Sequence, residues 1–137
     1  MPAITKVIID VNIWVNYCTN GRIANMVNLP VNFDIVIYAS SDLLNELEEV
    51  LQRPSPSKRL TASHSMYMEV VKNITMKVKP PKVFNKSPDK DDNYLFDLAL
   101  HVGADYIVTF DNALLNFNES PVTIIHIKDF KKVFPFE

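Results

Sequence analysis

Four acidic residues stand at the ends or on the flanks of apolar runs, in four separate segments of the 137-residue chain. They are Asp10, Glu46, Asp92 and Asp111. Asp10 follows the run 7–9, and Asp111 follows the run 106–110. An apolar run that ends in a carboxylate is typical of a parallel strand, whose carboxyl end lies at the edge of the sheet where ligands bind. Carboxylates gathered at that edge repel one another unless a divalent cation joins them, so the pattern indicates a metal site.

Taken singly, each acid has a plainer interpretation. An Asp after a strand often caps the next helix, and a Glu within a helix usually faces water. Acids at a helix start complement the helix dipole, but Asp89, Asp91 and Asp92 together exceed what the dipole needs, because they also repel one another. The metal interpretation therefore depends on the four positions occurring together.

The remaining composition narrows the chemistry. Oxygen ligands favour Mg²⁺ or Mn²⁺ over zinc, and Cys18 is the only cysteine, so neither an intrachain disulfide nor a thiolate metal site is expected. With two glycines, the chain has no phosphate-binding glycine loop and no dinucleotide fingerprint. No serine nucleophile motif is present either. Carboxylates that hold a divalent ion are typical of phosphodiester hydrolysis.

The net charge of −2 conceals an asymmetry along the chain. Residues 53–86 contain eight basic residues and one acid, a net charge of +7, and the other residues carry −9. A basic segment beside an acidic metal site suits a polyanionic substrate such as a nucleic acid, although lysines that only solubilise a helix would give the same pattern.

The elements that must position these acids follow from apolar periodicity. Strands are predicted at 6–10, 33–38, 105–110 and 122–126, and helices at 12–17, 23–29, 41–51, 61–78, 89–102 and 129–133. This alternation predicts an α/β fold, a three-layer α/β/α sandwich with a central, mainly parallel sheet, formed as one domain over residues 1–137.

Several boundaries carry specific expectations. Pro30 should stop the helix 23–29, and the helix after Ser40 or Ser41 should end before Pro54. Gly103 should cap the helix 89–102. In the helix 61–78, the expected core positions are Met66, Val70, Ile74 and Met76.

No apolar run has the roughly 18 to 20 residues that a bilayer requires, and the first residues lack the apolar region of a signal peptide. A cytoplasmic location is the expectation.

Four motifs in this order resemble those of PIN-domain ribonucleases, in particular the VapC-like toxins of bacterial toxin–antitoxin systems. The resemblance runs nearly end to end. The motifs are Val7-Ile8-Ile9-Asp10-Val11-Asn12, Ser41-Asp42-Leu43-Leu44-Asn45-Glu46-Leu47, Asp91-Asp92-Asn93-Tyr94-Leu95-Phe96-Asp97-Leu98-Ala99 and Gly103-Ala104-Asp105-Tyr106-Ile107-Val108-Thr109-Phe110-Asp111.

The resemblance implies Mg²⁺- or Mn²⁺-dependent cleavage of RNA, homodimers and inhibition by a cognate antitoxin. It places the catalytic, metal-binding acids at Asp10, Glu46, Asp92 and Asp111, with Asn12 close by. The helix register favours Asp92 over Asp91, since residues 95 and 99 follow it on the apolar stripe.

Asp97 stands where the subgroup tends to carry an acid, so it is a further candidate, and Asp91 stays open as well. Two departures from the family pattern are Val11, in place of the usual Thr, and Phe110, in place of a residue that is usually small.

Two other classes remain to be weighed. A receiver- or dehalogenase-like phosphoryl-transfer domain also uses a strand-end Asp, but Asn12 stands where a dehalogenase-like site has its second Asp. A non-catalytic PIN-fold module that binds RNA or protein is the main alternative, and retention of all four acids argues against it. The toxin role and general RNA processing are both open.

Overall fold

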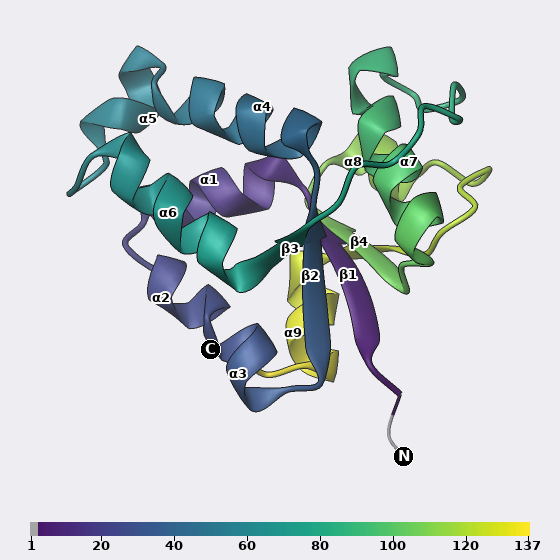
Figure 1. Cartoon of the computed structure of the whole chain (residues 1–137), viewed down its shortest axis with the longest axis horizontal. Coiled ribbons are helices and arrows are strands. Elements are labelled where there is room, and N and C mark those ends of the chain that lie inside the picture. Colours follow the sequence, from purple (N-terminus) through teal and green to yellow (C-terminus); the bar gives the residue numbers. More distant parts are fainter. Residues whose placement is uncertain (1–2) are drawn as a thin grey trace.

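The computed structural model describes residues 3–137, in which a five-stranded sheet lies between helices (Figure 1). The strands are β1 (Thr5–Ile9), β2 (Ile35–Ala39), β3 (Thr75–Lys77), β4 (Tyr106–Thr109) and β5 (Ile124–His126). Each strand pairs in parallel with its neighbour, in the order β3-β2-β1-β4-β5. The predicted α/β class is confirmed, and the sheet is wholly parallel.

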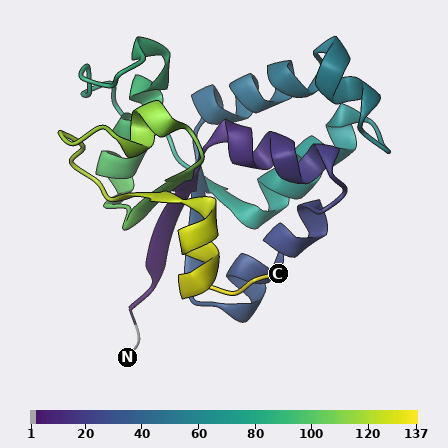
Figure 2. The ribbon, with the colours of Figure 1, turned by 180° about the vertical axis from the view of Figure 1, so that it is seen from behind.

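The helices lie on both sides of this sheet. They are α1 (Val11–Thr19), α2 (Ile23–Met26), α3 (Asn28–Asn32), α4 (Ser41–Leu51), α5 (Pro54–Lys58), α6 (His64–Ile74), the 3₁₀ turn η1 (Lys90–Asp92), α7 (Asn93–Val102), α8 (Asn112–Leu115) and α9 (Ile127–Val133). Figure 1 shows α1, α4 and α6 on one side of the sheet and α7 and α8 on the other. The view from behind in Figure 2 shows α9, which packs on β4 and β5.

The strand order creates a reversal in the middle of the sheet. From β1 the chain winds outward to β2 and β3, and it then returns to add β4 and β5 on the opposite side of β1. In open α/β sheets, a crevice forms where the winding direction reverses, outside the carboxyl ends of the strands. Here that point lies between β1 and β4, the strands that precede Asp10 and Asp111.

The central strand explains the apolar runs in the sequence. Val7, Ile8 and Ile9 of β1 are at most 1% exposed, because helices cover both faces of the sheet. Cys18 is buried in the same core, and burial raises the pKa of its thiol to about 12, which makes it an unreactive core residue. Among the helices formed by residues 3–137, none combines the length and apolar character that crossing a bilayer requires.

The prediction of one helix over 61–78 was wrong at its two ends, since the helix covers only 64–74. Helix α6 begins after Ser63, whose hydroxyl accepts a hydrogen bond from the backbone N–H of Met66, and the chain then becomes the edge strand β3. Met66 and Met76, which were expected in the core, are 60% and 54% exposed. The buried face of α6 is instead formed by Tyr67, Met68 and Val71. A strand of three residues is too short to show a period of its own.

Two prolines lie in the first turns of short helices. The prediction that Pro30 stops a helix over 23–29 was wrong, because α2 ends at Met26 and Pro30 lies in the first turn of α3. The helix α4 ends at Leu51, before Pro54, as predicted, and Pro54 is the first residue of α5. A backbone N–H has no partner within the first turn, so proline loses nothing there. The other boundary expectations are confirmed: Ser40 caps α4 through the N–H of Leu43, and Gly103 ends α7 with φ of 68°.

Candidate active site

A hollow of about 400 Å³ opens at the carboxyl ends of β1 and β4, where the winding of the sheet reverses. It is lined by Asp10, Val11, Asn12, Val15, Glu46, Val50, Asp89, Asp92 and Asp111. We call it the acidic pocket. The structure therefore brings the four acids singled out in the sequence to one place, from segments up to about a hundred residues apart, and it adds Asp89.

Asp10 is the most buried acid of the pocket, with 7% exposure. It occupies the N-cap position of α1, but its side chain makes no capping hydrogen bond. Its Oδ2 instead accepts a hydrogen bond of 2.8 Å from the hydroxyl of Thr109, at the end of β4. The capping interpretation therefore does not describe the Asp10 side chain, which is directed at the neighbouring strand end.

Thr109 organises the pocket, and the sequence analysis gave it no role. Its fully buried hydroxyl donates to Asp10 and accepts from the backbone N–H of Asp111 (3.0 Å) and from Nδ2 of Asn12 (3.3 Å). One donated and two accepted bonds use the full capacity of a hydroxyl. The signal in the sequence was a hydroxyl residue two positions before a strand-end acid, which alone resembles an ordinary turn.

The Asn12 side chain has a buried oxygen that no hydrogen-bond donor of the described residues reaches. Because the Thr109 proton goes to Asp10, the Asn12 atom that faces Thr109 must be its nitrogen, which fixes the orientation of the amide. Its Oδ1 is then buried without a hydrogen-bond partner among the described residues. A buried, unpaired acceptor on the wall of an acidic pocket suits a bound cation or its water.

The remaining acids of the pocket come from the end of β4, which precedes Asp111, and from the turn before α7. Asp111 caps α8 through a bond of 2.9 Å between its Oδ1 and the N–H of Ala113 while it also lines the pocket. Asp92 ends η1 and makes no capping bond with its side chain. Asp89, which begins η1, accepts the N–H of Asp91 at 2.9 Å. Asp89 was not among the predicted site residues, because an acid cluster before a helix is partly explained by the helix dipole.

Glu46 is supplied by α4, the helix that follows β2. Its Oε2 accepts a hydrogen bond of 2.6 Å from the hydroxyl of Tyr94, in the first turn of α7. Burial, with the bond to Glu46 second, raises the pKa of Tyr94 above its ordinary value, so Tyr94 remains a protonated donor. Glu46 and Tyr94 thus join the two helices that bring acids to the pocket.

Asp97 and Asp91, which the sequence left open, do not line the acidic pocket. Oδ1 of the buried Asp97 accepts the backbone N–H groups of Val83 (2.8 Å) and Phe84 (2.7 Å). Asp97 therefore fastens the proline-rich connector to α7. Asp91 is exposed and, like Asp97, borders a second, polar hollow that Glu46 also lines.

Two acids of the pocket, Asp10 and Asp92, hold protons more strongly than usual. Burial, followed by smaller contributions from the charges of Asp111 and Glu46, raises the pKa of Asp10 to about 6, despite the bond from Thr109. Burial and then the charge of Asp10, followed by those of other pocket acids, raise the pKa of Asp92 to about 7. Ionising both groups near neutral pH is costly, and a bound cation would remove that cost.

The donor set fits a hard divalent cation: carboxylate oxygens and one amide oxygen, without sulfur or imidazole. The unpaired Oδ1 of Asn12 and the raised pKa values of Asp10 and Asp92 support the same fit. As the side chains of residues 3–137 stand, no three of the His, Cys, Asp or Glu groups converge closely enough to hold one ion. Repulsion between uncompensated carboxylates favours such a separation.

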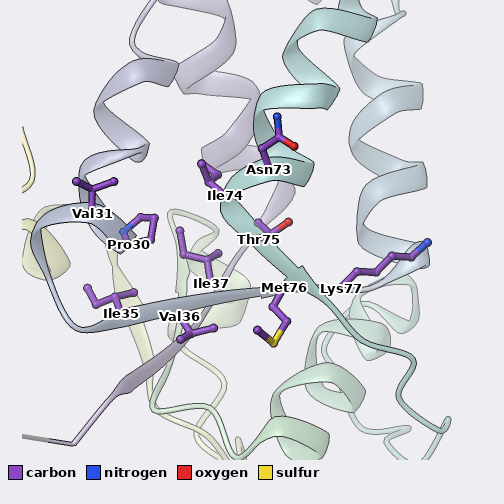
Figure 3. Close-up of a pocket in the computed structure, with 10 residues that line it drawn as sticks. All are labelled: Pro30, Val31, Ile35, Val36, Ile37, Asn73, Ile74, Thr75, Met76 and Lys77. Carbon is purple, nitrogen blue, oxygen red and sulfur yellow. The ribbon is translucent and has the colours of Figure 1, made fainter.

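Two other hollows are larger than the acidic pocket. The polar one, of about 640 Å³, has Arg53, Lys82 and Lys90 on its wall beside several acids. The other, of about 590 Å³, is mostly apolar and lies at the edge strand β3, away from the acids (Figure 3). The basic segment found in the sequence is therefore divided, since Arg53 and Lys82 approach Glu46 while Lys77 lines the apolar hollow.

The chain is thus a parallel α/β domain whose acids, from separate segments, meet at the reversal point of the sheet, where domains of this class bind their ligands. The chain matches the PIN domain family over residues 6–113, most of its length, and it belongs to that family. PIN domains are generally nucleases that use divalent metal ions.

Among solved structures, the fold is similar to that of PAE2754 from Pyrobaculum aerophilum, with a TM-score of 0.63 and 13% sequence identity. The alignment covers 97% of this chain and 91% of that one, and at this identity it supports the fold alone. A comparison with curated proteins finds no match.

Proposed function

We propose that this protein is a Mg²⁺- or Mn²⁺-dependent endoribonuclease that hydrolyses phosphodiester bonds in RNA. One observation carries the proposal. Four carboxylates from separate segments border a single pocket at the reversal point of a PIN-family sheet, and two of them, Asp10 and Asp92, have raised pKa values. A fold does not keep such unfavourable charges together for stability, so they indicate a ligand that compensates them.

In this proposal Asp10, Asp92 and Asp111 hold the cation, and Glu46 is a further ligand or orients the attacking water. When bound, the ion activates water at neutral pH and stabilises negative charge on the phosphoryl oxygens. Thr109 keeps Asp10 aimed into the pocket by a bond of 2.8 Å. The backbone N–H of Asp111 is held by the same hydroxyl, so one threonine fixes both strand ends.

The substrate in this proposal is a single-stranded or structured RNA. Arg53, Lys82 and Lys90 line the polar hollow that shares Glu46 with the acidic pocket, which supports an approach of the phosphate backbone from that side. Acids also line this hollow, so the three basic residues would steer the RNA toward the site rather than bind it tightly.

The test is RNA cleavage by the purified protein with Mg²⁺ or Mn²⁺, and with a chelator as the blank. Asp10→Asn should reduce cleavage to the chelator level while the protein remains folded by circular dichroism. Asp129→Asn is the matched control, because Asp129 is an exposed acid on α9 that makes only a surface ion pair, with Lys132 at 3.6 Å, and does not line the acidic pocket. Cleavage by Asp10→Asn at the wild-type rate, or no metal-dependent cleavage by any form, would contradict the proposal and favour a non-catalytic binding module.

We further propose that the protein is the toxin of a toxin–antitoxin pair, active as a homodimer and inhibited by a small antitoxin protein. The support is the likeness of its four motifs to VapC-like toxins. Expression in a bacterial host should arrest growth, Asp10→Asn should not, and co-expression of a short neighbouring reading frame should restore growth. Normal growth during wild-type expression would instead favour general RNA processing.

A further inference from the structure

Tyr94 makes the shortest side-chain hydrogen bond to a residue of the acidic pocket. Its hydroxyl donates to Oε2 of Glu46 at 2.6 Å, between the first turn of α7 and the middle of α4. Hydrogen bonds to an ionised acceptor are shorter and roughly twice as strong as those between neutral groups. This contact joins the helix of Glu46 directly to the helix that follows Asp92.

The two hollows show from which side Tyr94 acts. Glu46 borders both the acidic pocket and the polar hollow, whereas Tyr94 lines the polar hollow only. Tyr94 therefore meets Glu46 at the wall of the polar hollow and does not itself line the acidic pocket. With Oε2 engaged there, no hydrogen bond among the described residues involves Oε1.

A glutamate on a helix otherwise has considerable rotational freedom. Fixing a Glu side chain costs conformational entropy, and a flexible metal ligand would have to lose that freedom each time it binds an ion. Partners that hold a metal ligand from behind are commonly what fixes its orientation. Glu46 is only partly buried, so packing alone does not fix it.

We propose that Tyr94 is a positioning residue, whose hydroxyl holds the Glu46 carboxylate so that its second oxygen serves the divalent cation of the acidic pocket. This inference rests on the proposed metal-dependent function. It gives Glu46, the acid whose role depends most on family resemblance, a physical reason for being in place. The opposite role is also testable: if Tyr94 drew Glu46 out of the pocket, its removal would strengthen metal binding.

The experiment measures Mn²⁺ affinity without RNA, by calorimetry or by Mn²⁺ paramagnetic resonance. Tyr94→Phe removes the hydroxyl and keeps the ring, and it should raise the Kd for Mn²⁺ roughly tenfold, the lower range for the loss of such a partner. Tyr67→Phe is the matched control, because the Tyr67 hydroxyl, on α6, is bonded to Thr61 at 3.0 Å. That control should leave the Kd unchanged.

A double-mutant cycle with Glu46→Gln separates positioning from general loosening. If Tyr94 acts through Glu46, adding Tyr94→Phe to Glu46→Gln should change the Kd no further. Additive effects, an equal effect of Tyr67→Phe, or unchanged or tighter Mn²⁺ binding by Tyr94→Phe would each overturn the inference.

The result also distinguishes this inference from the proposed function. If the wild type binds Mn²⁺ and cleaves RNA while Tyr94→Phe behaves identically, only the role of Tyr94 is lost. If the wild type neither binds Mn²⁺ nor cleaves, the proposed function fails, and the inference fails with it.

Discussion

The acidic pocket and the apolar hollow at β3 differ in what their residues cost the folded chain. The apolar hollow is the larger, about 590 Å³ against 400 Å³, and Lys77 is the one charged residue among the ten that line it (Figure 3). The acidic pocket is smaller, but five carboxylates from four separate segments line it. Its walls include a buried Asp10 with a raised pKa and an unpaired amide oxygen of Asn12.

The difference shows that size alone does not identify a functional hollow. Strand β3 lies at the edge of the sheet, so side chains beside it are exposed because no further strand pairs with it. The acids, in contrast, need three hydrogen bonds of Thr109 and a tyrosine hydroxyl to be held where they repel one another. Charged side chains that are held together at a cost in stability, with no partner to compensate them, are the better guide to a binding site.

Neutralising an acid of the pocket should have the largest effect. Asp92→Asn should lower the rate of metal-dependent RNA cleavage by more than about 100-fold, since losing even an outer partner of a metal ligand typically costs 10- to 100-fold. Met76→Gln, at the apolar hollow, should leave the rate within about twofold, because Met76 is exposed and lies on the wall of the other hollow. Cleavage rates at saturating Mn²⁺ provide the measurement. Comparable losses in both variants would remove the distinction between the two hollows.

The same substitution can be made once in each hollow. Thr109→Val removes the hydroxyl that serves Asp10, Asn12 and Asp111, and should lower cleavage by about 10- to 100-fold. It should also destabilise the protein by about 1 to 3 kcal/mol, because buried partners are left unpaired. Thr75→Val removes a hydroxyl that donates only to the Val71 carbonyl, at 2.8 Å, and should leave cleavage unchanged. Denaturant unfolding and cleavage assays on the pair test this, and a larger loss of activity in Thr75→Val would contradict it.

The parts that sequence reasoning predicted share one physical property. Asp10, Asp92 and Asp111 each follow or begin an element whose period is strong, and the rule that parallel strands end at one edge then brings them together. Gly103 and Ser40 were predictable for a similar reason, since each meets a local backbone requirement that few residues satisfy. The roles of the acids as metal ligands remain predictions.

The parts that sequence reasoning missed depend on contacts between distant segments. Thr109 and Tyr94 matter through bonds to residues 99 and 48 positions away, and neither lies in a pattern that distinguishes it from its neighbours. Strand β3 pairs with β2 over three residues only. Its exposed Met76 continues the apolar spacing of the preceding helix in the sequence, so it was predicted as a core residue of that helix. Local propensity cannot reveal which partner such residues will meet.

A smaller difference between the two hollows should appear in how the free energy of unfolding depends on pH. Asp10 has a pKa of about 6 in the folded protein against 3.8 for an ordinary Asp, so the folded state binds the proton more strongly. The contribution of the Asp10 carboxyl to the free energy of unfolding is therefore fully present below about pH 4 and is lost as the pH rises through 6. The raised pKa of Asp92, about 7, acts in the same direction. Metal-free protein should therefore lose stability between pH 4 and pH 7.5.

Asp10→Asn isolates this contribution. In the presence of a chelator, the variant should be more stable than the wild type at pH 7.5 by an amount on the order of 2 kcal/mol, and the advantage should vanish near pH 3.5. Urea unfolding at the two pH values provides the measurement. Saturating Mn²⁺ should reverse the order at pH 7.5, because the ion stabilises only the protein that binds it. A stability difference that does not depend on pH would mean that the Asp10 carboxyl is not destabilised in the fold.

The smallest effect should come from the apolar hollow itself. Met76 is 54% exposed and Val31 is 70% exposed, so much of each side chain already faces water in the folded state, as it does in the unfolded chain. Met76→Gln and Val31→Thr should accordingly change the free energy of unfolding by no more than about 0.5 kcal/mol, without the pH dependence of Asp10→Asn. Urea unfolding at pH 4 and 7.5 tests both points. A loss above about 1 kcal/mol would show that these side chains contribute to the core, and the contrast between an apolar hollow that costs little and an acidic pocket that costs much would then no longer hold.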